Sequence, residues 1–123
     1  MNFKNWKTKI SKQSCVIGKT VQNELGELII QIENAEKEKF EIKVLPEIYE
    51  IGSEEHYFDL WKILNKNELN TYGTTLIIEN SEWLNRFSTV RENKTEFEHF
   101  MIIGIDKVIN LISEKEPIIK KLK

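Results

Sequence analysis

The chain has 123 residues, of which 40% are hydrophobic and 31% are charged. This composition is typical of one globular domain and excludes an intrinsically disordered chain or a low-complexity linker. The 18 basic and 20 acidic side chains give a net charge of −2, which excludes the strongly basic balance of a nonspecific nucleic-acid binder. We therefore expect a single domain over residues 1–123 and no nucleic-acid partner.

Cys15 is the only cysteine, so neither an intramolecular disulfide nor a site of several thiolates can form. A single thiol fits a reducing compartment. The start of the chain has no apolar run typical of an export signal, and no stretch approaches the ~20 apolar residues that cross a bilayer. These features predict a cytoplasmic protein without membrane contact.

Apolar residues recur with a period of two in the first half of the chain, as in half-buried strands. Leu28, Ile30 and Ile32 show this alternation most clearly, and the polar stretch 34–39 that follows them predicts a hairpin. Pro46 cannot donate to a strand ladder, so we expect a break or an edge there. The strands expected in this half are 15–21, 28–33, 40–45 and 48–51.

After Gly52 the period becomes helical, because Tyr57, Leu60, Trp61 and Leu64 are spaced at i, i+3, i+4 and i+7. With Ser53 as the N-cap, this spacing predicts a helix over about 53–66.

A second, short helix over about 81–88 is predicted by the N-cap pair Asn80 and Ser81. Strands are expected at 74–79, 96–103 and 107–112, with a short tail or edge segment at 118–123. Together the elements predict an α+β fold: a mostly antiparallel sheet of about five to seven strands, with both helices against one face.

Searches for motifs that hold cofactors or metals find nothing. The sequence has no G-x-G-x-x-G, P-loop, H-E-x-x-H, C-x-x-C or EF-hand spacing. We therefore expect no cofactor and no metal, and we assign no catalytic residue.

Two weaker candidates for chemistry remain. Cys15 with His56 or His99 supplies the parts of a thiol nucleophile, although Cys15 stands in an apolar strand, where a thiol is usually inert. Glu55, His56 and Asp59 have helical spacing that suits a metal, although acids in a first turn are also expected for the helix dipole. The alternative function is therefore a small enzyme or ligand-binding domain that uses His56 or His99 in a cleft.

The most informative stretch is 44–61, which contains five acids and no lysine or arginine. Such a density of like charge costs stability, and a basic protein partner would relieve it. A solvated surface without a partner is the competing interpretation. The residues expected to bind a partner are the carboxylates Glu47, Glu50, Glu54, Glu55 and Asp59, with Tyr57 and Trp61 as aromatic anchors.

Four segments of the sequence, taken together, are similar to other small proteins: 26–30 (GELII), 58–61 (FDLW), 80–84 (NSEWL) and 99–113. With these segments the chain looks like small uncharacterised bacterial proteins, some of which resemble immunity proteins that neutralise toxins. The resemblance implies a compact, non-catalytic α+β domain that masks one cognate toxin, often a nuclease. It transfers no functional residue by position, so the partner-binding residues rest on charge alone.

Overall fold

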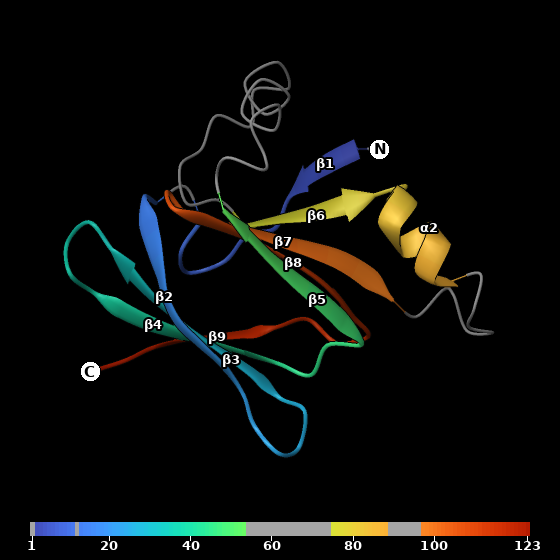
Figure 1. The fold of residues 1–123 in the computed structure, drawn as a ribbon. Coiled ribbons are helices and arrows are strands. Elements are labelled where there is room, and N and C mark those ends of the chain that lie inside the picture. The colour runs from blue at the N-terminus through green and yellow to red at the C-terminus, as the bar shows by residue number, and fades with distance from the viewer. Residues whose placement is uncertain (1, 12, 54–74, 89–96) are drawn as a thin grey trace.

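The computed structural model describes residues 2–11, 13–53, 75–88 and 97–123 (Figure 1). Within these ranges the elements follow the order β1 (Asn2–Asn5), β2 (Cys15–Gln22), β3 (Leu28–Asn34), β4 (Lys39–Val44), β5 (Ile48–Ser53), β6 (Thr75–Glu79), α2 (Glu82–Ser88), β7 (Glu98–Ile103), β8 (Lys107–Ser113) and β9 (Ile118–Lys121).

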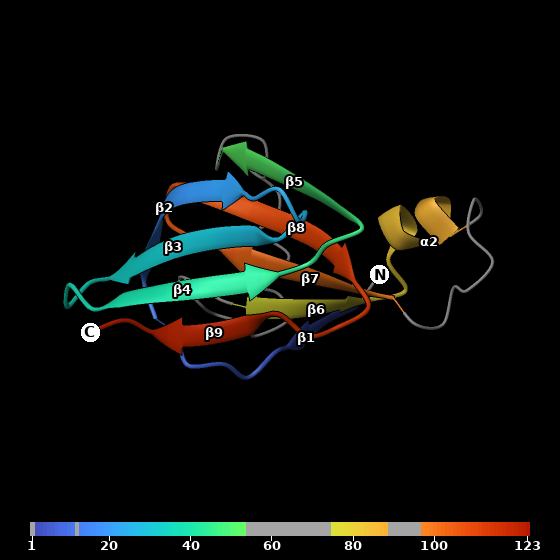
Figure 2. The ribbon, with the colours of Figure 1, turned by 90° about the horizontal axis from the view of Figure 1, so that it is seen from below.

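The strands form two antiparallel sheets. One has the order β1-β6-β7-β8-β5 and the other the order β2-β3-β4-β9. The two sheets lie face to face, and the chain passes from one to the other between β1 and β2, between β4 and β5 and between β8 and β9 (Figure 2). The expected α+β fold with a single sheet is therefore wrong, because the described chain is almost entirely β and its strands divide between two layers.

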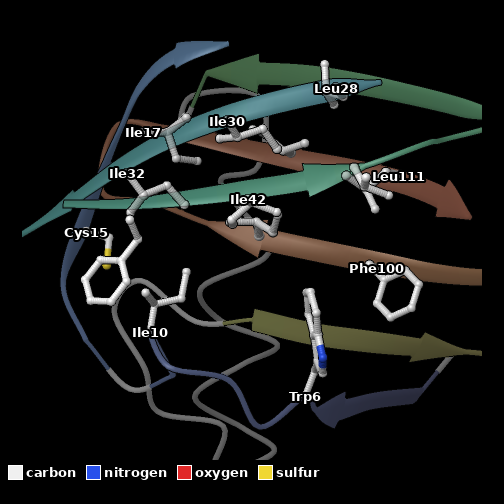
Figure 3. Packing of buried hydrophobic residues seen from close by; sticks show 14 residues of the cluster. Trp6, Ile10, Cys15, Ile17, Leu28, Ile30, Ile32, Ile42, Phe100 and Leu111 are labelled. Carbon is white, nitrogen blue, oxygen red and sulfur yellow. The ribbon is translucent and has the colours of Figure 1, made fainter. Parts of the chain in front are cut away.

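The main hydrophobic core fills the space between the two sheets. The four-stranded sheet contributes Ile17, Ile30 and Ile42, and the five-stranded sheet contributes Phe100 and Leu111. Trp6 lies against Phe100 with a ring-centroid distance of 4.9 Å (Figure 3). Side chains from two facing sheets thus share one core, as in β-sandwiches.

A second apolar cluster lies on the other face of the five-stranded sheet. Leu76, Met101 and Val108 are buried there, and Phe3 packs against them. Strands β7 and β8 are consequently buried on both faces, so nearly every one of their residues is buried. This explains why 99–112 lacks the polar alternation of β3 and β4.

The hairpin expected around 34–39 is confirmed. Strands β3 and β4 pair from Leu28↔Val44 to Glu33↔Lys39, and Lys37 takes a positive φ of 69° in the turn. Strand β1 was not expected, and it pairs with β6 at the edge of the larger sheet.

The short helix predicted at 81–88 is present as α2. Its N-cap is Ser81, whose Oγ accepts the backbone N–H of Leu84 at 3.1 Å. The longer helix predicted at 53–66 falls, from residue 54 onward, outside the described residues, and its expected N-cap Ser53 is the last residue of β5. Over the described ranges, no helix has the length and apolar character needed to traverse a bilayer.

Candidate functional site

Two of the seven residues expected to bind a partner are described. Glu47 lies just before β5, and Glu50 lies within it. The remaining five fall outside the described residues: Glu54, Glu55, Tyr57, Asp59 and Trp61. The described part of the predicted face is therefore β5 and the turn that leads into it.

Strand β5 forms one edge of the five-stranded sheet and pairs with β8. After Pro46, pairing starts where the backbone N–H of Glu47 donates to the carbonyl of Ile112 at 2.8 Å. Ile48 and Ile51 remain 37% and 43% exposed, and both glutamates are exposed. Because side chains alternate along a strand, Ile48 and Glu50 lie on the face of the sheet that carries Asn110, whereas Ile51 lies on the same face as Tyr49.

Tyr49 holds β5 in place through the face of the larger sheet that points to the core between the sheets. Its ring packs against the core between the sheets, and its hydroxyl donates to Gln22 Oε1 on β2 at 3.4 Å. This contact links the edge strands of the two sheets, which lie next to each other in Figure 2. The exposed residues of β5 are therefore held on an ordered strand.

A cavity of about 420 Å³ lies at the end of β4. Its lining comes from the end of β4, the turn into β5, the residue before β3, the β8–β9 turn and the start of β9. The lining residues are Glu27, Lys43, Val44, Leu45, Glu47, Glu114, Lys115, Glu116 and Ile118. We call it the β4-end cavity. Its lining combines apolar side chains with more acidic than basic ones.

Two lining carboxylates are fixed by neighbouring groups. Glu27 accepts a hydrogen bond from Asn23 and lies 3.5 Å from the Lys43 ammonium. The hydrogen bond from Asn23, followed by the charge of Lys43, lowers the pKa of Glu27. Glu116 accepts a hydrogen bond from the indole N–H of Trp6, a core residue. The walls are thereby tied to the folded core.

His99 lies in a buried hydrogen-bonded network instead of a cleft. Its Nε2 is 2.7 Å from Asn110 Oδ1, and its Nδ1 is 2.7 Å from Ser81 Oγ. Because the amide oxygen can only accept, Nε2 carries the proton and Nδ1 accepts from the Ser81 hydroxyl. The three side chains are buried, and the Trp83 ring lies edge-on to the imidazole at 5.1 Å.

Burial sets the charge state of this histidine. Desolvation lowers the pKa of His99, while the hydrogen bond to Asn110 and the charge of Glu50 act in the opposite direction. The neutral ring fits the hydrogen bonds just described. A Ser–His contact also occurs in nucleophile activation, but here the Ser81 hydroxyl is buried and already caps α2. The arrangement joins α2 to β7 and β8.

Cys15 is unsuited to be a nucleophile. Burial raises the pKa of its thiol to about 11, so the thiolate that would react is scarce at neutral pH. It lies in the core between the sheets, whereas His99 alternates with the core residue Phe100 and points to the other face of the larger sheet. His56, the other expected partner, is outside the described residues.

The described ranges contain no group of three or more His, Cys, Asp or Glu side chains arranged to hold a metal ion. The metal candidate predicted from spacing, Glu55 with His56 and Asp59, lies outside those ranges.

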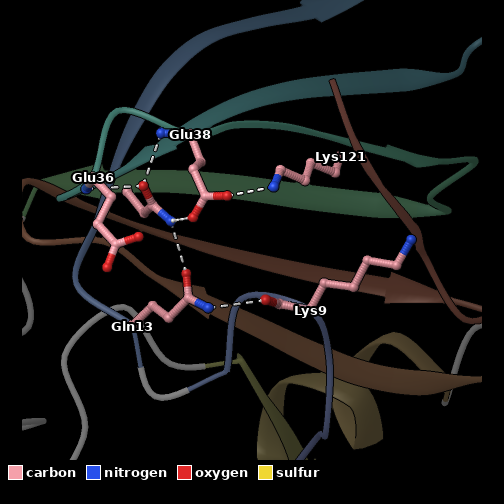
Figure 4. A network of polar contacts seen from close by, with 6 residues as sticks. Lys9, Gln13, Glu36, Glu38 and Lys121 are labelled. Atoms are coloured by element: carbon pink, nitrogen blue, oxygen red, sulfur yellow. Dashed lines mark hydrogen bonds and ion pairs between the residues drawn. The ribbon is translucent and has the colours of Figure 1, made fainter. Parts of the chain in front are cut away.

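A polar cluster at the β3–β4 turn is structural. The Asn34 side-chain nitrogen donates to Gln13 at 3.1 Å and to Glu38 at 3.0 Å, and its oxygen accepts the backbone N–H groups of Glu36 and Glu38 (Figure 4). Glu38 also pairs with Lys121. The hydrogen bond from Lys121, followed by that from Asn34, lowers the pKa of Glu38. These contacts stabilise the β3–β4 turn and hold β9 against the hairpin.

Sequence reasoning missed the β4-end cavity. Glu27, Glu114 and Glu116 lie outside the acidic stretch 44–61, and they meet Glu47 only because β4, β5 and the β8–β9 turn converge. It also missed Ser81 and Asn110 as partners of His99. The one available signal was Ser81, which the pattern identified as a helix N-cap.

Comparison with known protein families, with curated proteins and with solved structures finds no match in any of the three. The resemblance to immunity proteins accordingly stays a prediction, and a proposal of function has to rest on the geometry of the chain itself.

Proposed function

We propose that the protein is a non-catalytic binding domain that docks a basic protein through its acidic segment around β5. The observation that carries the proposal is the exposed edge strand β5. Glu50 lies beside Ile48 on one face of this strand, Ile51 is exposed on the other face, and the exposed Glu47 stands where the strand begins. Immunity proteins that mask a bacterial toxin domain are the kind of binder that this proposal favours.

The composition of β5 suits a binding edge. An exposed edge strand with apolar side chains invites pairing with other chains, and charged residues on it restrict which chains can approach. Carboxylates attract a basic partner and raise its association rate, while apolar residues that become buried supply affinity. Glu47 and Glu50 take the first role, and Ile48 and Ile51 take the second.

The remaining residues of the proposed face follow β5 directly in the sequence. Glu54, Glu55 and Asp59 extend the same negative charge, and Tyr57 and Trp61 are the residue types that most often anchor interfaces. In this proposal the domain works in the cytoplasm, which suits a chain with one buried thiol.

The alternative proposal is an enzyme or ligand-binding domain that uses His56 or His99. The geometry at His99 supports this less well, because the ring is buried and both nitrogens are engaged by protein groups. Neither the β4-end cavity nor the shallower ones beside Asn34 and Val16 include it. The binding proposal therefore stands first.

The test uses as its probe the basic domain of a candidate partner, chosen from a neighbouring reading frame that encodes one. Calorimetry compares the wild type with a variant that carries Glu50→Lys, Glu54→Lys and Glu55→Lys. We expect at least about tenfold weaker binding in this variant, because attraction becomes repulsion. A control with Glu24→Lys, Glu36→Lys and Glu79→Lys makes the same change of charge at exposed positions elsewhere and should bind within about twofold of the wild type. Equal affinities of both variants would overturn the proposed face.

A further inference from the structure

We infer that the β4-end cavity receives an arginine side chain of a basic protein. The inference rests on the proposed function and deepens it, because it names the chemical group that enters one particular place. Glu47 belongs to both the cavity and the proposed binding face, since it lines the cavity and also begins the acidic segment at β5.

The apolar part of the lining fits the aliphatic part of such a side chain. Val44, Leu45 and Ile118 form this part, and Leu45 and Ile118 are 62% and 69% exposed. Long cationic side chains lay their methylene groups along apolar surface while the charged end stays among polar groups. Burial of the two exposed residues against a partner would remove apolar surface from water and favour binding.

The charge of the lining fits the cationic end. Four glutamates stand against two lysines, which leaves an excess of two negative charges. Lys43 lies 3.5 Å from Glu27 within the wall, so one lysine is already matched to a carboxylate of the lining. A guanidinium carries several N–H donors in a planar fork and can bind two carboxylates at once, which a lysine ammonium does less well.

The cavity is also preorganised. The indole of Trp6 fixes Glu116, and the Ser113 hydroxyl donates to the Lys115 carbonyl at 2.7 Å while it accepts the Lys115 backbone N–H at 3.2 Å. Ser113 is itself buried. The β8–β9 turn is therefore ordered before any partner arrives, so binding does not have to order it.

The experiment titrates the isotope-labelled protein with an acetylated Gly-Arg-Arg-Gly amide and follows backbone amide signals by NMR. Matched peptides carry lysine or the uncharged isostere citrulline in place of arginine. We expect saturable shifts at residues 43–47 and 114–118 with the arginine peptide, at least about threefold weaker binding of the lysine peptide, and no saturable shifts with citrulline. The variant Glu47→Gln with Glu114→Gln should bind the arginine peptide at least about fivefold more weakly.

The control variant combines Glu36→Gln with Glu41→Gln, which removes the same charge from the β3–β4 turn and the middle of β4. It should bind the arginine peptide as the wild type does. Shifts spread over the whole surface, equal binding of lysine and arginine peptides, or equal loss in both variants would overturn the inference. The peptide test needs no protein partner, so its failure is distinct from a failure of the charge reversal at Glu50, Glu54 and Glu55.

Discussion

Ser81 and His99 are 18 residues apart in the sequence, and their side chains meet at 2.7 Å between Oγ and Nδ1. The same hydroxyl oxygen accepts the backbone N–H of Leu84 and so caps α2. One buried side chain therefore serves both the start of the helix and the histidine of β7, which makes the network sensitive to single substitutions.

The substitution Ser81→Ala should destabilise the fold by about 2–3 kcal/mol. It removes the helix cap and leaves His99 Nδ1 buried without its hydrogen-bond donor. Urea unfolding followed by tryptophan fluorescence measures the loss. Ser14→Ala is the control at a serine outside this network, and a loss below about 0.5 kcal/mol in Ser81→Ala would contradict the role given to the hydroxyl.

The stability contributed by His99 should fall as the pH is lowered. Burial lowers the pKa of His99 in the folded state, whereas an unfolded histidine titrates near pH ~6.5. Above that pH the histidine is neutral in the folded and in the unfolded chain, so its full contribution to the free energy of unfolding is present. Below it the unfolded chain takes up the proton first, so the free energy of unfolding decreases by up to about 1.4 kcal/mol per pH unit.

Urea unfolding between pH 7.5 and 5.0 measures this effect. The wild type should lose stability over the window more steeply than His99→Gln, which does not titrate. Glu27 and Glu38, whose pKa values are lowered in the folded state, are present in both proteins, so the difference between the two curves reports His99. Parallel curves for the two proteins would mean that the histidine does not stay neutral in the folded state.

The substitution Gly26→Ala should destabilise the protein by about 1 kcal/mol, while Gly18→Ala should change stability little. Gly26 has a φ of +85°, which favours glycine, although an added Cβ would meet only Leu45 at an ordinary 3.4 Å. At Gly18 an added Cβ would lie 3.4 Å from the Gln31 carbonyl oxygen, and the φ of this residue is not in the left-handed region that favours glycine. Thermal unfolding of the two variants checks this, and equal losses would show that φ does not decide the outcome.

The Cys15 thiol should react with a disulfide reagent at pH 7.5 at least about a hundredfold more slowly in the folded protein than in 6 M urea. Burial keeps the reagent away from the thiol, and the pKa of about 11 keeps the thiolate fraction low. Absorbance of the released chromophore gives the two rates. Complete labelling of the folded protein within seconds would restore Cys15 as a candidate nucleophile.

The sequence predicted local elements better than their assembly. Strands β3 and β4 bury one face, so their alternation shows in the sequence. Strands β7 and β8 are buried on both faces, which hid the existence of a second layer. Strand β1 has one large apolar residue, Phe3, and pairs with β6 more than 70 residues away, so no local pattern could identify it.

The site was predictable only where its residues are neighbours in the sequence. The charge around Glu47 and Glu50 stands out in the composition of one segment. The β4-end cavity brings Glu47 close to Glu114, and the network at His99 brings Ser81 close to Asn110. These residues are far apart in the sequence, and they meet only because of the strand register and the passage of the chain between the sheets. Neither juxtaposition has a signature in the sequence.

The most direct measurement of the proposed docking at β5 is the salt dependence of the rate at which the protein associates with the basic domain used as the probe in the binding test. Stopped-flow fluorescence should show association slowing at least about tenfold between 20 and 500 mM NaCl, with much less change in dissociation. Glu47→Gln combined with Glu50→Gln should flatten this dependence. An association rate that does not change with salt, or a salt dependence that is as steep in this double variant as in the wild type, would contradict docking through the carboxylates of this edge.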